Sequence, residues 1–196
     1  KDGQAAVPRD LSKVAMCEGG AGELLEVAGV SKAYGGVKPA QDVSFRLQRG
    51  HIHALIGPNG AGKSTMINML TGIVRPDSGA IRFLGGDVTG EPAHAICRSG
   101  VGRTFQNLRL FGDLSVLDNV LLGRHCRMAN GLWVSLLGLP KAGRSEASAR
   151  EHALALLEFL GLGEHAQRPA GSLPYGLQRR VELARALATH PQLLLL

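Results

Sequence analysis

The chain has 196 residues, of which 44% are hydrophobic and 19% are charged, and this balance fits a globular protein of one or two domains. Its formal net charge of +6 suits contact with phosphate groups, an anionic membrane surface or nucleic acid. Only 4% of the residues are aromatic and the basic residues are dispersed, so an interface for nucleic acid is not expected. The three cysteines lack zinc-ligand spacing, and no apolar run reaches the roughly 18 residues of a membrane span.

The first half of the chain predicts several strands and one helix. Residues 1–22 have no periodicity and are expected to form a flexible leader or linker. Strands are expected at 24–30, 42–47, 51–56 and 80–84, where apolar residues alternate or cluster. Residues 63–70 have helical spacing, and Thr71-Gly72 is expected to end that helix.

The second half of the chain predicts helices. Ser115, followed three residues later by Asp118, is typical of a capped N-terminus and predicts a helix through Leu122. Further helices are expected at 145–160 and 177–188. The first of these carries an apolar stripe made of Ala153, Leu156, Leu157 and Leu160. Strands at both ends with helices between them favour an α/β core with a helical insertion.

A glycine-rich loop with the pattern Gly-x-x-x-x-Gly-Lys-Ser joins the expected strand at 51–56 to the helix at 63–70. Its glycines let the backbone curl, so that its N–H groups and the helix N-terminus offer a positive pole to phosphate oxygens. Lys63 would reach the β- and γ-phosphates, Ser64 would coordinate Mg²⁺, and Thr65 would donate to a nearer phosphate. The pattern predicts a nucleoside triphosphate site, with ATP as the expected ligand. The other loop residues are Gly57, Pro58, Asn59, Gly60, Ala61 and Gly62.

Three motifs in this order resemble those of ATP-binding-cassette (ABC) ATPases. The loop at 57–65, Gly-Pro-Asn-Gly-Ala-Gly-Lys-Ser-Thr, resembles their Walker A loop, and residues 101–106 resemble their Q-loop. Residues 173–180 resemble their signature motif, and the whole resemblance covers residues 24–196. The chain is most similar to the ATP-binding subunits of branched-chain amino-acid importers, and this similarity rests on residues 102–111, 114–120, 131–150 and 175–180.

The resemblance implies an α/β fold, namely a P-loop NTPase core of the ABC type with an antiparallel β subdomain and an inserted α-helical subdomain. We expect a single ABC domain at 23–196, after the leader at 1–22. Within this domain the core with the Walker A loop would span 24–105 and the helical subdomain 106–176. Residues 177–196 would return to the core, which we expect to be incomplete at its C-terminal side.

The resemblance also implies roles for individual residues. Tyr34 matches the aromatic residue that stacks on adenine, with an ordinary tyrosine at a strand end as the alternative. Gln106 would contact Mg²⁺ and the attacking water, which makes it the candidate catalytic residue and a metal ligand. Tyr175, Gly176 and Gln178 would face the ATP held by a second ABC ATPase subunit, in a homodimer or a heterodimer.

The sequence departs from the family pattern in two places. Pro174 stands where most signature motifs have a serine, so a hydroxyl and an N–H donor are lost. The run 193–196 matches a strand that in the family leads to an Asp for Mg²⁺ and a Glu that polarises water. Neither these residues nor the later switch His are among the 196 residues. We therefore expect this stretch alone to bind nucleotide without turnover, and the intact parent to hydrolyse ATP.

The function that the resemblance implies is an ATP-binding subunit that powers import of branched-chain amino acids or a related small polar solute. It would lie peripherally on the cytoplasmic face of the inner membrane, with membrane permease subunits as partners and a periplasmic substrate-binding protein as an indirect one. Residues 106–120 and the apolar segment around Trp133 would receive the permease, although Trp133 could instead belong to the helical core. The alternatives are a soluble ABC ATPase, a nucleotide-binding fragment without turnover and, more distantly, a small-molecule kinase.

Overall fold

The computed structural model describes residues 22–104, 109–125 and 140–196. Two compact units make up the chain: a sheet unit within Cys17–Val101 and a helical unit within Gly102–Leu194. Gln106 and Trp133 lie outside the described residues, and so do the leader at 1–21 and most of the apolar segment at 131–140. None of the helices in the described ranges combines the length and the apolar character needed to cross a bilayer.

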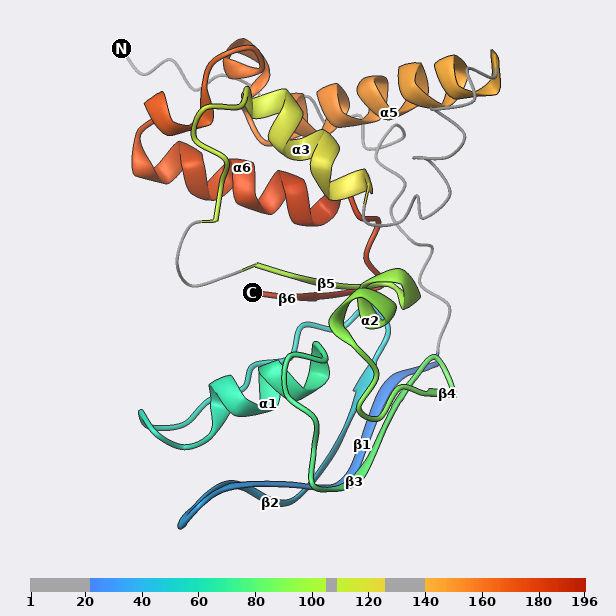
Figure 1. Cartoon of the computed structure of the whole chain (residues 1–196), viewed down its shortest axis with the longest axis vertical. Helices are drawn as coiled ribbons and strands as arrows, with labels where there is room; N and C mark the ends of the chain where they lie inside the picture. The colour runs from blue at the N-terminus through green and yellow to red at the C-terminus, as the bar shows by residue number, and fades with distance from the viewer. Residues whose placement is uncertain (1–21, 105–108, 126–139) are drawn as a thin grey trace. The chain divides into compact units, whose positions relative to one another are not determined.

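The sheet unit contains a four-stranded antiparallel sheet in the order β2-β1-β3-β4 (Figure 1). Its elements are β1 (Glu23–Tyr34), β2 (Val37–Gln48), α1 (Lys63–Leu70), β3 (Ser78–Phe83), β4 (Gly86–Asp87) and α2 (Ala93–Ser99). The hairpin of β1 and β2 pairs along its length and turns at Gly35-Gly36. These elements confirm the strands expected at 24–30, 42–47 and 80–84 to within a few residues, and α1 coincides with the expected helix.

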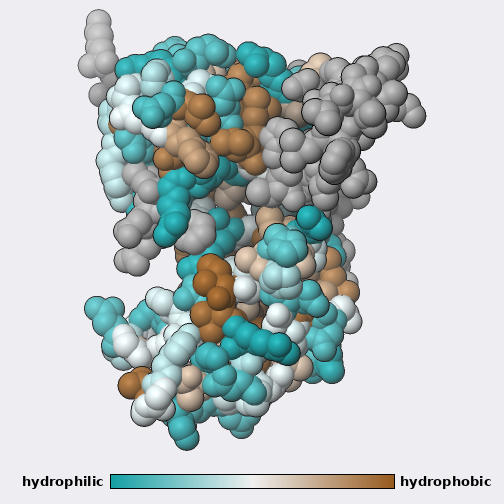
Figure 2. Space-filling model, in the orientation of Figure 1, coloured by the Kyte–Doolittle hydropathy of each residue, from teal (hydrophilic) through white to brown (hydrophobic). Residues whose placement is uncertain are grey.

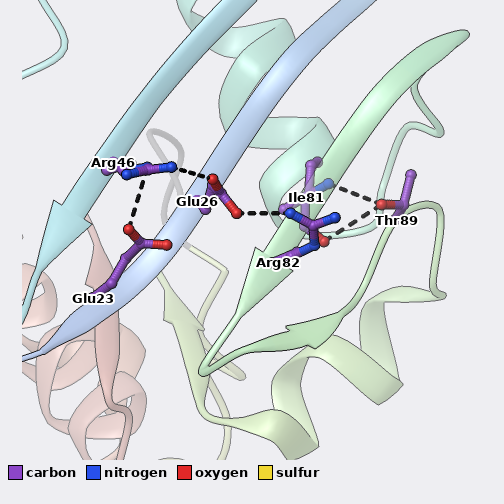
Figure 3. Close-up of polar contacts among 6 residues, drawn as sticks. All are labelled: Glu23, Glu26, Arg46, Ile81, Arg82 and Thr89. Atoms are coloured by element: carbon purple, nitrogen blue, oxygen red, sulfur yellow. Dashed lines mark hydrogen bonds and ion pairs between the residues drawn. The ribbon is translucent and has the colours of Figure 1, made fainter.

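The sheet alternates between buried apolar side chains and exposed charges, as a half-buried antiparallel sheet does. Buried residues of this unit include Leu25, Val27, Val30, Met69 and Ile81. On the charged side, Glu26 accepts from Arg46 at 2.7 Å and from Arg82 at 2.9 Å, so one carboxylate links three strands (Figure 3). The Thr89 hydroxyl accepts the Ile81 N–H at 2.8 Å and thereby extends the edge of β3 (Figure 3).

The strand expected at 51–56 is wrong. These residues have no regular secondary structure, and Ile52 and Ile56 are almost fully exposed. An apolar run becomes a strand only when another strand accepts and donates its backbone hydrogen bonds. In the described part of the sheet unit, the four strands pair among themselves and none pairs with this segment.

The helical unit is built from α3 (Val116–His125), α5 (Pro140–Phe159) and α6 (Tyr175–Leu187), with short 3-10 turns η2 (Gly163–His165) and η3 (Ala170–Ser172) between the last two helices. β5 (Val101–Arg103) and β6 (Leu193–Leu195) pair as a two-stranded sheet. All three expected helices are found, although α3 extends beyond its expected end and α5 and α6 begin before their expected starts. Their core includes Val116, Val120, Leu156, Leu157, Leu162 and Val181, and contains three of the four predicted stripe residues.

Hydrophobic side chains also reach the surface of the helical unit. Figure 2 shows them gathered over α3 on the face turned to the viewer. The large apolar residues that are exposed in and just before this helix are Phe111, Leu114 and Leu122. Phe111 and Leu114 lie within the segment 106–120 that the sequence predicts as permease-contacting, and Leu122 follows just after it.

Candidate functional site

The glycine-rich loop runs into α1 through a backbone conformation that favours glycine. Gly60 and Gly62 have φ angles of 85° and 83°, in the left-handed region that side chains rarely adopt. Gly62 is the N-cap of α1, and a Cβ there would overlap the carbonyl oxygen of Pro39 and lie 2.8 Å from its carbon. Strand β2 therefore fixes where the loop ends and the helix begins.

The N-terminus of α1 is open to an anion. No side chain caps it, and the first helical hydrogen bond runs from Met66 N–H to Gly62 O at 2.9 Å. The N–H groups before Met66 have no acceptor within the helix. They add the positive end of the helix dipole to the backbone amides of the loop, which is the arrangement that binds phosphate.

Lys63 lies folded over the loop. Its ammonium nitrogen donates to the carbonyl oxygens of Gly57 at 2.5 Å and Pro58 at 2.6 Å. The Ser64 side chain is exposed and Thr65 is half-buried, so the Ser64 hydroxyl is accessible to a metal ion from solvent. The residues present fit a magnesium–triphosphate group: glycines that admit it closely, a lysine ammonium, an open helix terminus and a hydroxyl ligand.

Tyr34 ends β1 in the same unit as the loop. Its side chain is 49% exposed, and the Lys32 ammonium nitrogen lies over the ring, 5.6 Å from the centroid. Tyr34 pairs with Val37 on β2, two residues before the Pro39 carbonyl that contacts Gly62. One hairpin thus carries both the predicted adenine-stacking ring and the Pro39 carbonyl that contacts the end of the glycine-rich loop.

The predicted signature residues lie at the N-terminus of α6, in the helical unit. Pro174 is the N-cap and no side chain caps the helix, so its first turn is open. Tyr175 is 64% exposed, and a Cβ on Gly176 would meet no atom within 4 Å. Gln178 is turned back instead, because its amide donates to Leu173 O at 2.8 Å. The contact of Gln178 with nucleotide stays a prediction.

A row of side chains along α6 holds Tyr175. The Arg179 Nε donates to the Tyr175 hydroxyl at 3.0 Å, and its guanidinium carbon lies 5.3 Å from the centre of the tyrosine ring. Arg179 also pairs with Glu182 at 3.1 Å, and the Glu182 side chain is only 2% exposed. These hydrogen bonds, with Tyr175 the largest cause, raise the pKa of Arg179 above its ordinary value.

Asn119, which no sequence motif singles out, is fully buried in α3. Its amide oxygen accepts from Phe111 N–H at 2.9 Å, and its amide nitrogen donates to Phe111 O and Ser115 O, each at 3.0 Å. Asn119 therefore fastens the exposed segment at 111–115 to the helix. A polar residue between the apolar positions Val116 and Val120 was the available signal.

The chain is similar to known proteins over most of its length. The sequence profile of the ABC transporter family matches residues 40–196. The chain is 42% identical over 173 residues to the high-affinity branched-chain amino acid transport ATP-binding protein BraF of Pseudomonas aeruginosa, covering 88% of this chain and 68% of that protein. It is 43% identical, with the same coverage, to LivG of Salmonella typhimurium, which has the same description.

A solved structure also resembles the chain. The ADP conformation of an ATP-binding cassette of an ABC transporter has a TM-score of 0.74 and 35% identity, covering 88% of this chain and 67% of that one. The match confirms the α/β fold of the ABC type that the motifs predicted. With its glycine-rich loop before α1 and these relatives, the chain belongs to the ABC transporter family as an ATP-binding cassette.

Proposed function

We propose that the chain is the ATP-binding subunit of a membrane importer for branched-chain amino acids or a related small polar solute. The observation that carries the proposal is the glycine-rich loop at 57–64, the phosphate loop of this proposal, where the ammonium of Lys63 and the uncapped N-terminus of α1 follow directly on Gly62. The substrate class follows from BraF and LivG, which are described as branched-chain amino acid transport proteins.

In this proposal the phosphates of ATP bind the backbone amides of the loop and of the first turn of α1. The ammonium of Lys63 moves from the Gly57 and Pro58 carbonyls to the β- and γ-phosphates, since a charged acceptor is the stronger partner. Ser64 ligates Mg²⁺ together with Gln106, and Tyr34 stacks on the adenine. Magnesium neutralises phosphate charge when it is bound.

The open N-terminus of α6 suits a second nucleotide contact. Tyr175 and Gly176 would face the ATP held by a second cassette, so that two nucleotides lie between two subunits. The exposed apolar residues Phe111, Leu114 and Leu122 would lie against a permease at the cytoplasmic face of the membrane. Hydrolysis is proposed for the intact protein.

Nucleotide titrations test the binding step. We expect Lys63→Ala to raise the Kd of ATP by about ten- to a hundredfold, because a charge-assisted contact is lost. Arg98→Gln on α2 removes the same charge from an exposed position and should leave the Kd unchanged. If the two variants bind ATP as tightly as the unsubstituted chain, the loop is not the binding site.

Reconstitution tests the transport step. The intact protein should co-purify with a membrane permease and support ATP-dependent uptake of leucine in vesicles that also contain the substrate-binding protein. Uptake should fail with Lys63→Ala and persist with Arg98→Gln. A protein that hydrolyses ATP but is recovered free of any permease would favour the soluble ABC ATPase instead.

A further inference from the structure

Asp77 completes the edge of β1 where β3 ends. The last pair between these strands is Ser31 with Ser78, and β3 does not extend further along β1. The Asp77 backbone N–H donates to Ser31 O at 2.9 Å, and its Oδ2 accepts the Ala33 N–H at 2.8 Å. The Asp77 side chain thus accepts a backbone hydrogen bond of β1 where β3 has ended, and it restrains Ala33, the residue that precedes Tyr34.

The second oxygen of the same carboxylate holds Lys32. Asp77 Oδ1 and Lys32 Nζ are 2.6 Å apart, and the Lys32 side chain is only 16% exposed. These contacts, first with Lys32 and then with the Ala33 N–H, lower the pKa of Asp77 below its ordinary value, which keeps the carboxylate charged. The Lys32 ammonium nitrogen that Asp77 restrains lies over the ring of Tyr34, two residues further along β1.

Lys32 thus lies over one face of the Tyr34 ring, while the Tyr34 side chain as a whole remains half exposed. A cation over an aromatic face attracts the ring and limits its rotation. A ring that is already restrained loses less conformational entropy when a ligand stacks on it. We propose that Lys32 and Asp77 are positioning residues that hold Tyr34 so that the base of a nucleoside triphosphate stacks on its outer face. This inference rests on the proposed function, because it presumes that Tyr34 is at the nucleotide site.

Two ligands distinguish the contribution of the base to binding from that of the phosphates. ATP carries both, whereas inorganic tripolyphosphate carries only the group that the loop binds. We expect Lys32→Met and Asp77→Ala each to raise the Kd of ATP by about three- to tenfold, the range of a cation–π contact plus lost preorganisation. The Kd of tripolyphosphate should change little in either variant. Lys32→Arg keeps the cation and the ion pair and should retain the affinity for ATP.

The two substitutions also separate ring position from overall charge. Lys32→Met removes a positive charge and Asp77→Ala a negative one, so a general electrostatic effect would change phosphate affinity in opposite directions. If the Tyr34 ring is no longer held in place, ATP binding weakens in both variants. Glu26→Gln is the matched control for Asp77→Ala, since it removes a carboxylate charge from an ion-paired residue of β1, the strand that carries Lys32 and Tyr34. It should leave the ratio of the two Kd values unchanged.

A direct probe of Tyr34 reports ring position without nucleotide. The chain has two tyrosines, so Tyr175→Phe with 3-fluorotyrosine labelling leaves a single fluorine signal at Tyr34. Asp77→Ala should shift this signal, and Glu26→Gln should not. An unshifted signal, or an unchanged ratio of ATP to tripolyphosphate affinity, would overturn the inference while the proposed function stands. If the unsubstituted chain binds neither ligand, the proposed function itself fails.

Discussion

A methyl group placed on Gly62 tests how the sheet sets the phosphate loop. The φ angle of 83° costs an alanine about 1–2 kcal/mol in the left-handed region. The new Cβ would also overlap the Pro39 carbonyl, which belongs to a paired strand and cannot rotate away. Displacing β2 or α1 adds about 1–3 kcal/mol, as for other overpacked sites. Gly62→Ala should therefore lose about 2–5 kcal/mol of unfolding free energy in total.

Two other glycines separate these contributions. Gly60, with φ 85°, and Gly85, with φ 79° in the turn between β3 and β4, have no atom within 4 Å of an added Cβ. Alanine at either position should cost only about 1–2 kcal/mol in urea unfolding. In ATP titrations, Gly62→Ala should raise Kd at least tenfold, or about 1.4 kcal/mol, while Gly85→Ala should not change it. Equal unfolding free energies for all three variants would refute the contact with Pro39 as the reason for glycine.

Three further substitutions test the helical unit by urea unfolding. Burial is the largest cause that lowers the pKa of His152 below its ordinary 6.5. The contribution of His152 to the free energy of unfolding is therefore present above pH 6.5 and is lost as the pH falls towards the lowered pKa. His152→Gln should reduce the loss of stability between pH 7 and 5. Asn119→Ala should cost about 1–3 kcal/mol, because the backbone N–H and C=O of Phe111 lose their partner in hydrogen bonds that are partly buried, and a cost near zero would contradict a stabilising role of Asn119. Ser115→Ala removes the side-chain cap of α3 and should cost about 1 kcal/mol, with Ser115→Asp restoring most of it.

Local signals in the sequence predicted the parts of the fold that depend on neighbours along the chain. The cap of α3 is confirmed, because Ser115 Oγ accepts the Asp118 N–H at 3.0 Å and donates to the Asp118 carboxylate at 2.6 Å. The loop motif and the helical spacing predicted both the first and the last residue of α1 correctly. Both are short-range features, in which the side chain and the backbone that it serves lie within one turn.

Features that depend on distant partners could not be predicted in this way. An apolar run at 51–56 indicates burial but does not name the strand that would pair with it. Asp77 lies in a turn that its Pro-Asp-Ser-Gly sequence predicts. Nothing in the neighbouring residues shows that its carboxylate accepts hydrogen bonds from Ala33 and Lys32, more than forty positions earlier. For Asn119, a polar residue between apolar helix positions indicated a buried hydrogen bond, but the sequence did not identify Phe111, eight residues earlier, as its partner.

The hairpin of β1 and β2 connects the two ends of the proposed nucleotide site. Tyr34 pairs with Val37, and two residues further along β2 the Pro39 carbonyl closes on Gly62, so the pairing register sets the spacing between the base and the phosphates. The exposed ion pairs of Glu26 add little to that register, because surface pairs contribute only about 0–1 kcal/mol. The burial of alternate apolar side chains such as Val27 contributes more to the register, since a slip of one residue would turn these side chains towards solvent. Nucleotide affinity in this cassette should therefore depend on strand pairing that lies outside the phosphate loop.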